Sequence, residues 1–152
     1  MANPLQMLKL KPQGVQMIHE LPIAAPPARV WAALLNVGGW FIHDAAHPAK
    51  QKLELRPGGK WISESADRTA MQMMTVVYCE PGKLLRLCGQ MGMTHLPVTT
   101  VIIFELQPEA GGIKTLLRVG TRMFGTLPPG VKKMYRDGWN HYLPQLKALA
   151  ES

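Results

Sequence analysis

Two stretches decide the fold of this chain: APPARVWAALL at residues 25–35 and VKKMYRDGWNHYLPQLKALA at residues 131–150. Each repeats apolar side chains at helical spacing, which gives each helix one apolar face. Pro26 and Pro27 suit the start of the first helix, because the first turn of a helix does not need their missing N–H groups. We therefore predict two helices that bracket a long β-rich middle, and hence an α+β fold.

The C-terminal helix carries the clearest pattern in the chain. Its predicted apolar face consists of Val131, Met134, Tyr135, Gly138, Trp139, Tyr142, Leu143, Leu146 and Leu149. Pro144 lies inside this helix and predicts a kink, because its ring clashes with the carbonyl group of Asn140.

The middle of the chain has the alternating apolar pattern and the Pro-Gly and Gly-Gly turns of a β-sheet. Strands are predicted at residues 15–23, 52–56, 60–65, 71–79, 83–89, 97–107 and 113–124. Residues 90–96 have no clean period and predict a loop. In the last strand, alternation places Thr115, Leu117, Val119, Thr121 and Met123 on one face, which we expect to look at the closing helix.

Length and composition indicate one globular domain, since 47% of the 152 residues are hydrophobic and 18% are charged. We place the domain at residues 15–150 and treat residues 1–14 as an N-terminal extension that can be flexible. No apolar run approaches the about 20 residues of a membrane span. The extension lacks the features of a signal peptide, so we expect a cytoplasmic protein, or a periplasmic one if a signal peptide was removed from the natural chain.

The net charge of +7 does not by itself indicate a nucleic-acid partner. The basic residues are spread along the chain, and no aromatic side chains interleave with a basic run as on an RNA-binding sheet. We therefore predict no nucleic-acid binding. The sequence carries no signal for the oligomeric state.

Cys79 and Cys88 are the chain's two cysteines, and we predict that both are free thiols. A turn at residues 80–83 would set Cys79 opposite Leu84 and Cys88 opposite Thr75, about 13 Å apart along the ladder. A disulfide needs Cα atoms within about 7 Å of each other. Free thiols are consistent with a reducing compartment.

In their order along the chain, several short motifs resemble the START-like or helix-grip superfamily, in its polyketide cyclase/dehydrase and lipid-transport (SRPBCC) branch. The resemblance covers residues 15–150 and is carried by residues 23–31, Trp40, residues 55–59, 80–85 and 104–108, Gly111-Gly112, Gly138-Trp139, Leu143 and Leu146. It implies a curved antiparallel sheet of six to seven strands wrapped around the long C-terminal helix, with a hydrophobic cavity between them. Relatives often carry a Thr-His pair where this chain has Arg118-Val119, so an activity that needs that histidine is not expected.

Motifs for catalysis or metal binding are weak. His43 and His47 have i, i+4 spacing, but their segment reads as a loop without a third ligand or an HExxH glutamate. No serine lies in a nucleophile elbow, and no glycine-rich loop leads into a helix to hold phosphate. We therefore predict no catalytic residue, no metal site and no cofactor.

Ligand binding in the cavity is the predicted function, with a lipid, a polyketide or an aromatic metabolite as the small hydrophobic partner. The predicted site consists of Trp40, Phe41, His43, Trp61, Met74, Met91, Met93, Leu117, Trp139, Tyr142 and Leu143. The irregular segments 40–43 and 91–96 are predicted to form a lid, with Trp40, Phe41, Met91 and Met93 near the opening and Trp61, Met74, Trp139 and Leu143 deeper. Thioether side chains adapt to varied apolar partners, although core packing is their commoner role.

Two alternatives stay open at this point, because the fold hosts several functions. One is a cyclase or aromatase, for which the available polar candidates are His19, His43, Ser63, Glu54, Tyr78, Arg86 and Tyr142. The other is a protein-interaction module like the chaperone-ATPase activators that share this fold, in which the basic surface would bind an acidic partner in a salt-sensitive way.

Overall fold

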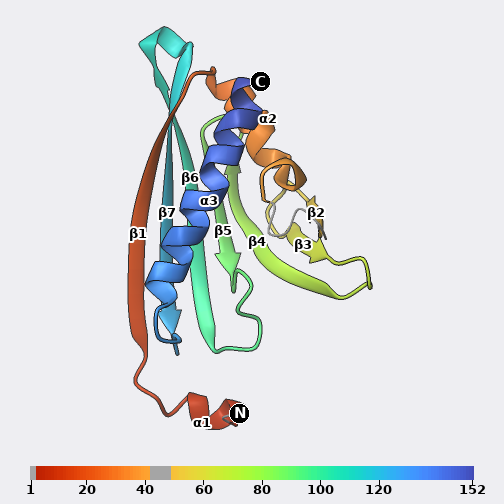
Figure 1. Ribbon diagram of the computed structural model, residues 1–152, viewed down its shortest axis with the longest axis vertical. Coiled ribbons are helices and arrows are strands. Elements are labelled where there is room, and N and C mark those ends of the chain that lie inside the picture. The colour runs from red at the N-terminus through yellow and green to blue at the C-terminus, as the bar shows by residue number, and fades with distance from the viewer. Residues whose placement is uncertain (1–2, 42–48) are drawn as a thin grey trace.

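A computed structural model describes residues 3–41 and 49–152, and in it a curved sheet wraps around a long helix (Figure 1). The elements run in the order α1 (Pro4–Met7), β1 (Gln13–Ile23), α2 (Pro27–Leu35), the 3-10 turn η1 (Val37–Gly39), β2 (Lys50–Leu53), β3 (Lys60–Glu64), β4 (Ala70–Glu80), β5 (Leu84–Gly89), β6 (Val98–Glu109), the 3-10 turn η2 (Ala110–Gly112), β7 (Lys114–Gly125) and α3 (Val131–Glu151).

The seven described strands form one antiparallel sheet in the order β1-β7-β6-β5-β4-β3-β2. Antiparallel hairpins join β2 to β3, β4 to β5 and β6 to β7, at turns that contain glycine. β1 comes first in the chain but pairs with the last strand, from Gln13 opposite Gly125 to Ile23 opposite Thr115. The α+β helix-grip architecture predicted from the sequence is therefore confirmed.

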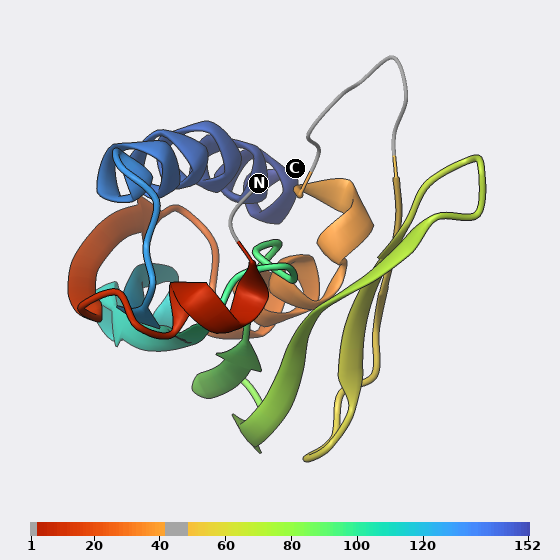
Figure 2. The same ribbon diagram turned by 90° about the horizontal axis from the view of Figure 1, so that it is seen from below.

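α3 lies across the concave face of the sheet (Figure 2). Most of the buried side chains on that face are apolar. The alternation predicted for the last strand is confirmed, since Thr115, Leu117, Val119, Thr121 and Met123 of β7 are buried. In β6 every second residue from Val98 to Leu106 is buried as well: Val98, Thr100, Ile102, Phe104 and Leu106. The core therefore sits between this face, α3 and α2.

Trp139 joins α3 to the sheet. Its buried indole Nε1 donates a hydrogen bond to Thr121 Oγ1 at 3.0 Å, and its ring stands edge-on to Phe104, with centroids 5.9 Å apart. A second buried hydroxyl, that of Thr115, donates to the Ala25 carbonyl at 2.8 Å. Both threonines thus have partners in the core, as buried hydroxyl groups require.

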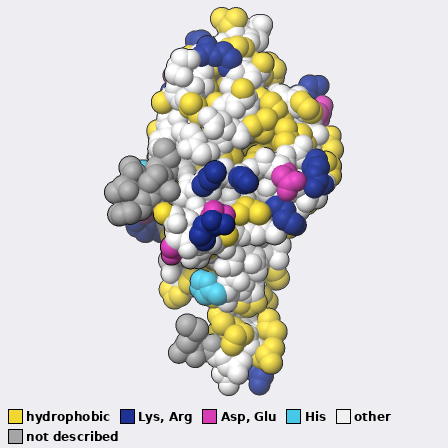
Figure 3. Space-filling view, turned by 90° about the vertical axis from the view of Figure 1, so that its right-hand side faces the viewer, with side chains coloured by type: hydrophobic (Ala, Val, Ile, Leu, Met, Phe, Trp, Pro, Cys, Tyr) yellow, Lys and Arg dark blue, Asp and Glu magenta, His cyan; other side chains and the backbone are white. Residues whose placement is uncertain are grey.

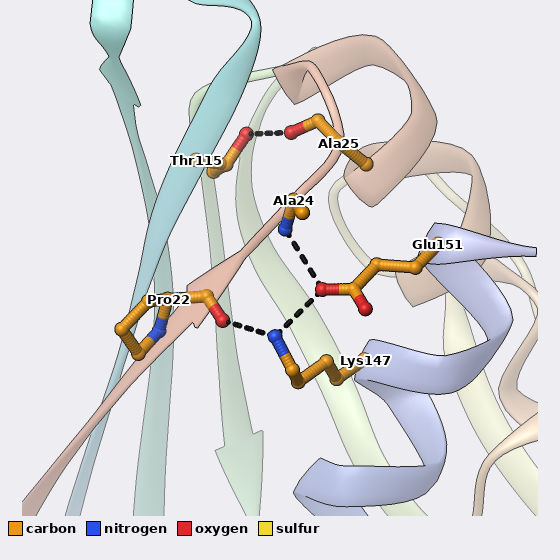
Figure 4. A network of polar contacts seen from close by, with 6 residues as sticks. All are labelled: Pro22, Ala24, Ala25, Thr115, Lys147 and Glu151. Carbon is orange, nitrogen blue, oxygen red and sulfur yellow. Dashed lines mark hydrogen bonds and ion pairs between the residues drawn. The ribbon is translucent and has the colours of Figure 1, made fainter.

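The C-terminal end of α3 is fixed to the junction between β1 and α2 (Figure 4). Lys147 Nζ donates to the Pro22 carbonyl at 2.8 Å and pairs with Glu151 at 2.6 Å. Glu151 also accepts a hydrogen bond from the Ala24 amide at 2.8 Å. The hydrogen bonds from Lys147 and then Ala24 lower the pKa of the Glu151 carboxyl.

α3 continues through Pro144 as one helix, and its buried side matches the predicted face except at Met134, which is exposed. Cys79 and Cys88 are free, as predicted. The predicted register is wrong at one of them: Cys88 faces Thr75, but Cys79 faces Leu85 instead of Leu84. A register shift between Val76 and Tyr78 displaces that end of the ladder.

The turn between β2 and β3 folds back onto β4. The Gly58 amide donates to the Val76 carbonyl at 2.8 Å, and the Gly59 carbonyl accepts from the Val76 amide at 2.8 Å. A Cβ atom at Gly59 would lie 2.1 Å from the carbonyl oxygen of Glu54. Only a residue without a side chain fits this close approach.

The substitution Gly59→Ala should lower the free energy of unfolding by about 1–3 kcal/mol, because the backbone around Glu54 must move to admit the methyl group. Urea unfolding followed by circular dichroism measures this loss. Gly14→Ala is the matched control, since its Cβ atom would make an ordinary contact of 3.8 Å with Phe124. Equal stability of the two variants would contradict the close approach.

His19 lies on the side of β1 that faces α3. Its ring centroid is 6.5 Å from that of Trp139, and its buried Nδ1 has no hydrogen-bond partner among the described residues. Burial, and to a smaller extent the positive charge of Arg136, lower the pKa of His19 below its ordinary 6.5.

We expect the protein to lose stability as the pH falls below 6.5, because the unfolded chain then binds a proton at His19 that the folded protein resists. His19→Gln should flatten this part of the pH dependence. Arg136→Gln should flatten it less, since it removes the smaller cause. Urea midpoints across a pH series test this, and an unchanged slope in His19→Gln would rule out His19 as the source.

Candidate functional site

A pocket of about 340 Å³ opens between the first half of α3, the start of β4 and the loop that follows β5. Its wall consists of Phe41, Met71, Met73, Met91, Gly92, Met93, Met134, Tyr135, Gly138, Trp139 and Tyr142. The volume falls in the range of small-molecule sites. None of these lining residues carries a formal charge at neutral pH, so the pocket suits an apolar ligand.

Methionine dominates the wall. Met71, Met73, Met91, Met93 and Met134 line the pocket, which is half of the chain's ten methionines. Met73, Met91 and Met93 are buried, whereas Met71 and Met134 are 36% and 54% exposed and lie toward solvent. Because the unbranched thioether side chain has several rotatable bonds, such a wall can adjust to ligands of different shape.

The loop after β5 is hydrogen-bonded to β4 and to α3, the two elements that flank the pocket. The Met91 amide donates to the Met73 carbonyl at 3.0 Å, and the Met91 carbonyl accepts from Tyr135 Oη at 2.6 Å. Gly92, at φ 91°, turns the chain between Met91 and Met93. These bonds place Met91 and Met93 over the pocket.

Two tyrosines on α3 supply the polar atoms at the wall. Burial raises the pKa of Tyr135 to about 12 and also raises the pKa of Tyr142. Both therefore stay neutral at physiological pH, and the Tyr135 hydroxyl keeps the proton that it donates to Met91. The Tyr142 ring lies beside Phe41, with centroids 4.4 Å apart.

The structure separates the predicted site residues into two groups. On the pocket wall lie Phe41, Met91, Met93, Trp139 and Tyr142. In the packed core, away from the wall, lie Trp40, Trp61, Met74, Leu117 and Leu143. His43 falls outside the described residues, as does His47, its partner in the metal site that was considered.

Trp40 was predicted near the opening, and this placement is corrected. Its Nε1 donates to the Leu34 carbonyl at 3.0 Å, and its ring packs against Phe41, Trp61 and Phe104. The aromatic cluster fills the space behind Phe41, which leaves Phe41 itself on the pocket wall.

Several wall residues were missed, and Met73 shows why. The β3–β4 register shifts so that Trp61 faces Met74 while Ile62 faces Gln72, which leaves Met73 as an extra residue. Both Met73 and Met74 are consequently buried, although strict alternation would separate them. Met71, Met134, Tyr135 and Gly138 were also missed. The high methionine content was the available signal for the first two.

The polar candidates for cyclase chemistry that the structure describes do not gather at this pocket, and His43 lies outside the described residues. Tyr142 lines it, whereas His19, Ser63, Glu54, Tyr78 and Arg86 do not. Among the described residues, no helix is long and apolar enough to cross a membrane.

Comparison with solved structures supports the fold. A protein from Chromobacterium violaceum is similar, with 22% identity, a TM-score of 0.72 and coverage of 90% of this chain and 97% of the other. An uncharacterised protein from Rhizobium leguminosarum aligns with 18% identity, a TM-score of 0.74 and coverage of 93% and 97%. CalU16 from Micromonospora echinospora aligns with 18% identity, a TM-score of 0.62 and coverage of 93% and 87%. At these identities, the likeness shows the fold alone.

A comparison with curated proteins found no match. Residues 24–151 match the profile of a family described as Activator of Hsp90 ATPase homolog 1-like protein. That range runs from the end of β1 through α3 and includes every described residue of the pocket wall. The chain therefore belongs to the Activator of Hsp90 ATPase homolog 1-like family, within the START-like superfamily that its sequence motifs resemble.

Proposed function

We propose that this domain binds a small hydrophobic molecule in the methionine-lined pocket beside α3. The observation that carries the proposal is a pocket of about 340 Å³ whose described wall residues are uncharged and include five methionines. Apolar surface that a ligand removes from water contributes roughly 25 cal/mol per Å² to binding before the costs of association.

The wall also supports a ligand with an unsaturated or aromatic part. The rings of Phe41, Trp139 and Tyr142 line one side of the pocket, and the flexible thioethers line much of the rest. Aromatic faces and methionine sulfur both make favourable contacts with ring systems. A lipid chain, a polyketide or an aromatic metabolite fits this chemistry.

Gly138 offers a direct test, because it lies on the pocket wall within α3. A Cβ atom there would make one contact, an ordinary one of 3.8 Å with Tyr142. The substitution Gly138→Leu should therefore fill the pocket and weaken binding of a lipophilic fluorescent dye by about tenfold or more. Stability should hold or rise, since leucine favours a helix by about 1 kcal/mol over glycine.

Ala148→Leu is the matched control, because it adds an exposed leucine to the same helix. It should leave dye affinity unchanged. Native mass spectrometry of the purified wild-type protein should show a co-purified apolar molecule that Gly138→Leu lacks. A stable Gly138→Leu variant with wild-type dye affinity would overturn the assignment of this pocket.

Regulation of a chaperone ATPase is a second candidate function, favoured by the family match over residues 24–151. The net charge of +7 suits an acidic surface on such a partner. If this reading holds, the protein should bind a purified Hsp90-type chaperone, change its rate of ATP hydrolysis, and bind less tightly as salt is raised. Binding that ignores ionic strength, or an unchanged ATPase rate, would count against it.

A further inference from the structure

One end of the molecule brings together three segments that are far apart in sequence. We call residues 3–14, 90–97 and 121–136 the basal end, which lies at the bottom of Figure 1. Thr126 Oγ1 donates to the Met7 carbonyl at 3.0 Å and so ties the N-terminal segment to the end of β7. Met93 and Val131 share a small apolar cluster that joins the other two segments.

The basal end is basic without any acidic residue. All ten Asp and Glu residues of the chain fall outside its three ranges. Its positive side chains are Lys9, Lys11, Arg122, Lys132, Lys133 and Arg136. Asp137 follows directly and pairs with Lys133 at 2.5 Å, but Lys9, Lys11 and Lys132 form no ion pair with a described residue. The opposite end mixes both signs, since Glu80, Glu109 and Glu151 lie there together with Lys83, Lys114 and Lys147.

Exposed leucines accompany these charges. Leu5, Leu8 and Leu10 are 73%, 64% and 57% exposed, and α1 has no buried residue. Lys9 and Lys11 alternate with them in the sequence. Figure 3 shows hydrophobic side chains gathered at this tip of the molecule, and Figure 2 looks onto the same end with α1 in front. Contiguous apolar side chains held in water indicate a surface that is covered by something.

We propose that the basal end docks onto an anionic lipid surface. The three leucines enter the boundary between headgroups and acyl chains, and Lys9, Lys11 and Lys132 lie against the negative headgroups. The side chains on α1 and after it mix apolar and basic character, as membrane-surface segments do. This inference goes beyond the proposed ligand binding and does not rest on it.

An anionic lipid surface explains both the exposed leucines and the basic side chains of the basal end, whereas other polyanions explain only the basic side chains. A nucleic acid would attract the lysines but would not use aliphatic side chains that lack aromatic rings for stacking. The pocket lies at the same end, because Met91, Met93, Met134 and Tyr135 belong to both. Docking in this orientation would bring the rim of the pocket close to the lipid surface.

Vesicle co-sedimentation tests the proposal with the whole 152-residue chain. The probes are vesicles of phosphatidylglycerol and phosphatidylcholine in equal parts, and vesicles of phosphatidylcholine alone. The wild type should bind the anionic vesicles, bind the neutral ones weakly, and lose affinity as salt is raised. The triple variant Leu5→Ser, Leu8→Ser, Leu10→Ser and the double variant Lys9→Glu, Lys11→Glu should each lose about tenfold or more in partitioning.

Matched controls come from the opposite end of the sheet. Ile113→Ser removes an apolar side chain that is 67% exposed, and Lys83→Glu with Lys114→Glu reverses two charges. Both should bind vesicles like the wild type, and dye binding in the pocket should survive in all of these variants. If the wild-type protein does not bind the dye, the proposed function is overturned, but the docking proposal is unaffected.

Four results would overturn the docking proposal. The first is that the wild-type protein does not bind anionic vesicles. The second is that the control variants lose as much binding as the basal-end variants. The third is that the triple leucine variant binds as tightly as the wild type, which would reduce the effect to charge alone. The fourth is a dimer, seen by light scattering, that becomes a monomer in the triple leucine variant while no form binds vesicles. That result would assign the leucines to contact between copies.

Discussion

The contact between Trp139 and the concave face of the sheet is the interaction on which the rest of the structure depends. A strongly curved sheet has one apolar face too large to leave in water, and one helix must cover it. Trp139 supplies the bulk and also carries a polar N–H, which Thr121 Oγ1 accepts at 3.0 Å inside the core. The burial of Thr121 thus has a physical reason, because its hydroxyl oxygen accepts the Trp139 N–H, which would otherwise be unpaired in the core.

The pocket borders both apolar clusters of the interior. The apolar interior consists of a large cluster that contains Trp139 and a small one formed by Met93, Val98, Met123 and Val131. Tyr135 packs against both clusters, and the pocket wall draws Met91 from the large cluster and Met93 from the small one. The pocket thus lies along the seam between two packed regions.

Much of the fold could be predicted because the strongest patterns coincide with complete burial on one side. Every second residue is buried from Val98 to Leu106 in β6 and from Thr115 to Met123 in β7, and α3 keeps a regular apolar face. Their β-branched composition and hydrophobic spacing therefore identify these elements. The site was harder to predict. A register shift adds Met73 to the buried side of β4, and nothing in a single sequence marks such a bulge. The depth of Trp40 depends on rings from two distant strands, Trp61 in β3 and Phe104 in β6, which the local sequence pattern does not contain.

The pairing of β1 with β7 has a consequence for how the chain folds. β1 is an edge strand of the sheet, and its hydrogen-bonded neighbour is β7. Gln13 therefore cannot pair until Gly125 has been synthesised. Contacts this distant in sequence slow folding, because a long loop must close before they form. During synthesis, the hairpins from β2 to β5 can form early, while β1 keeps its apolar side chains in water until β7 has been made. The nascent chain is therefore most exposed to aggregation just before its last strand and helix arrive.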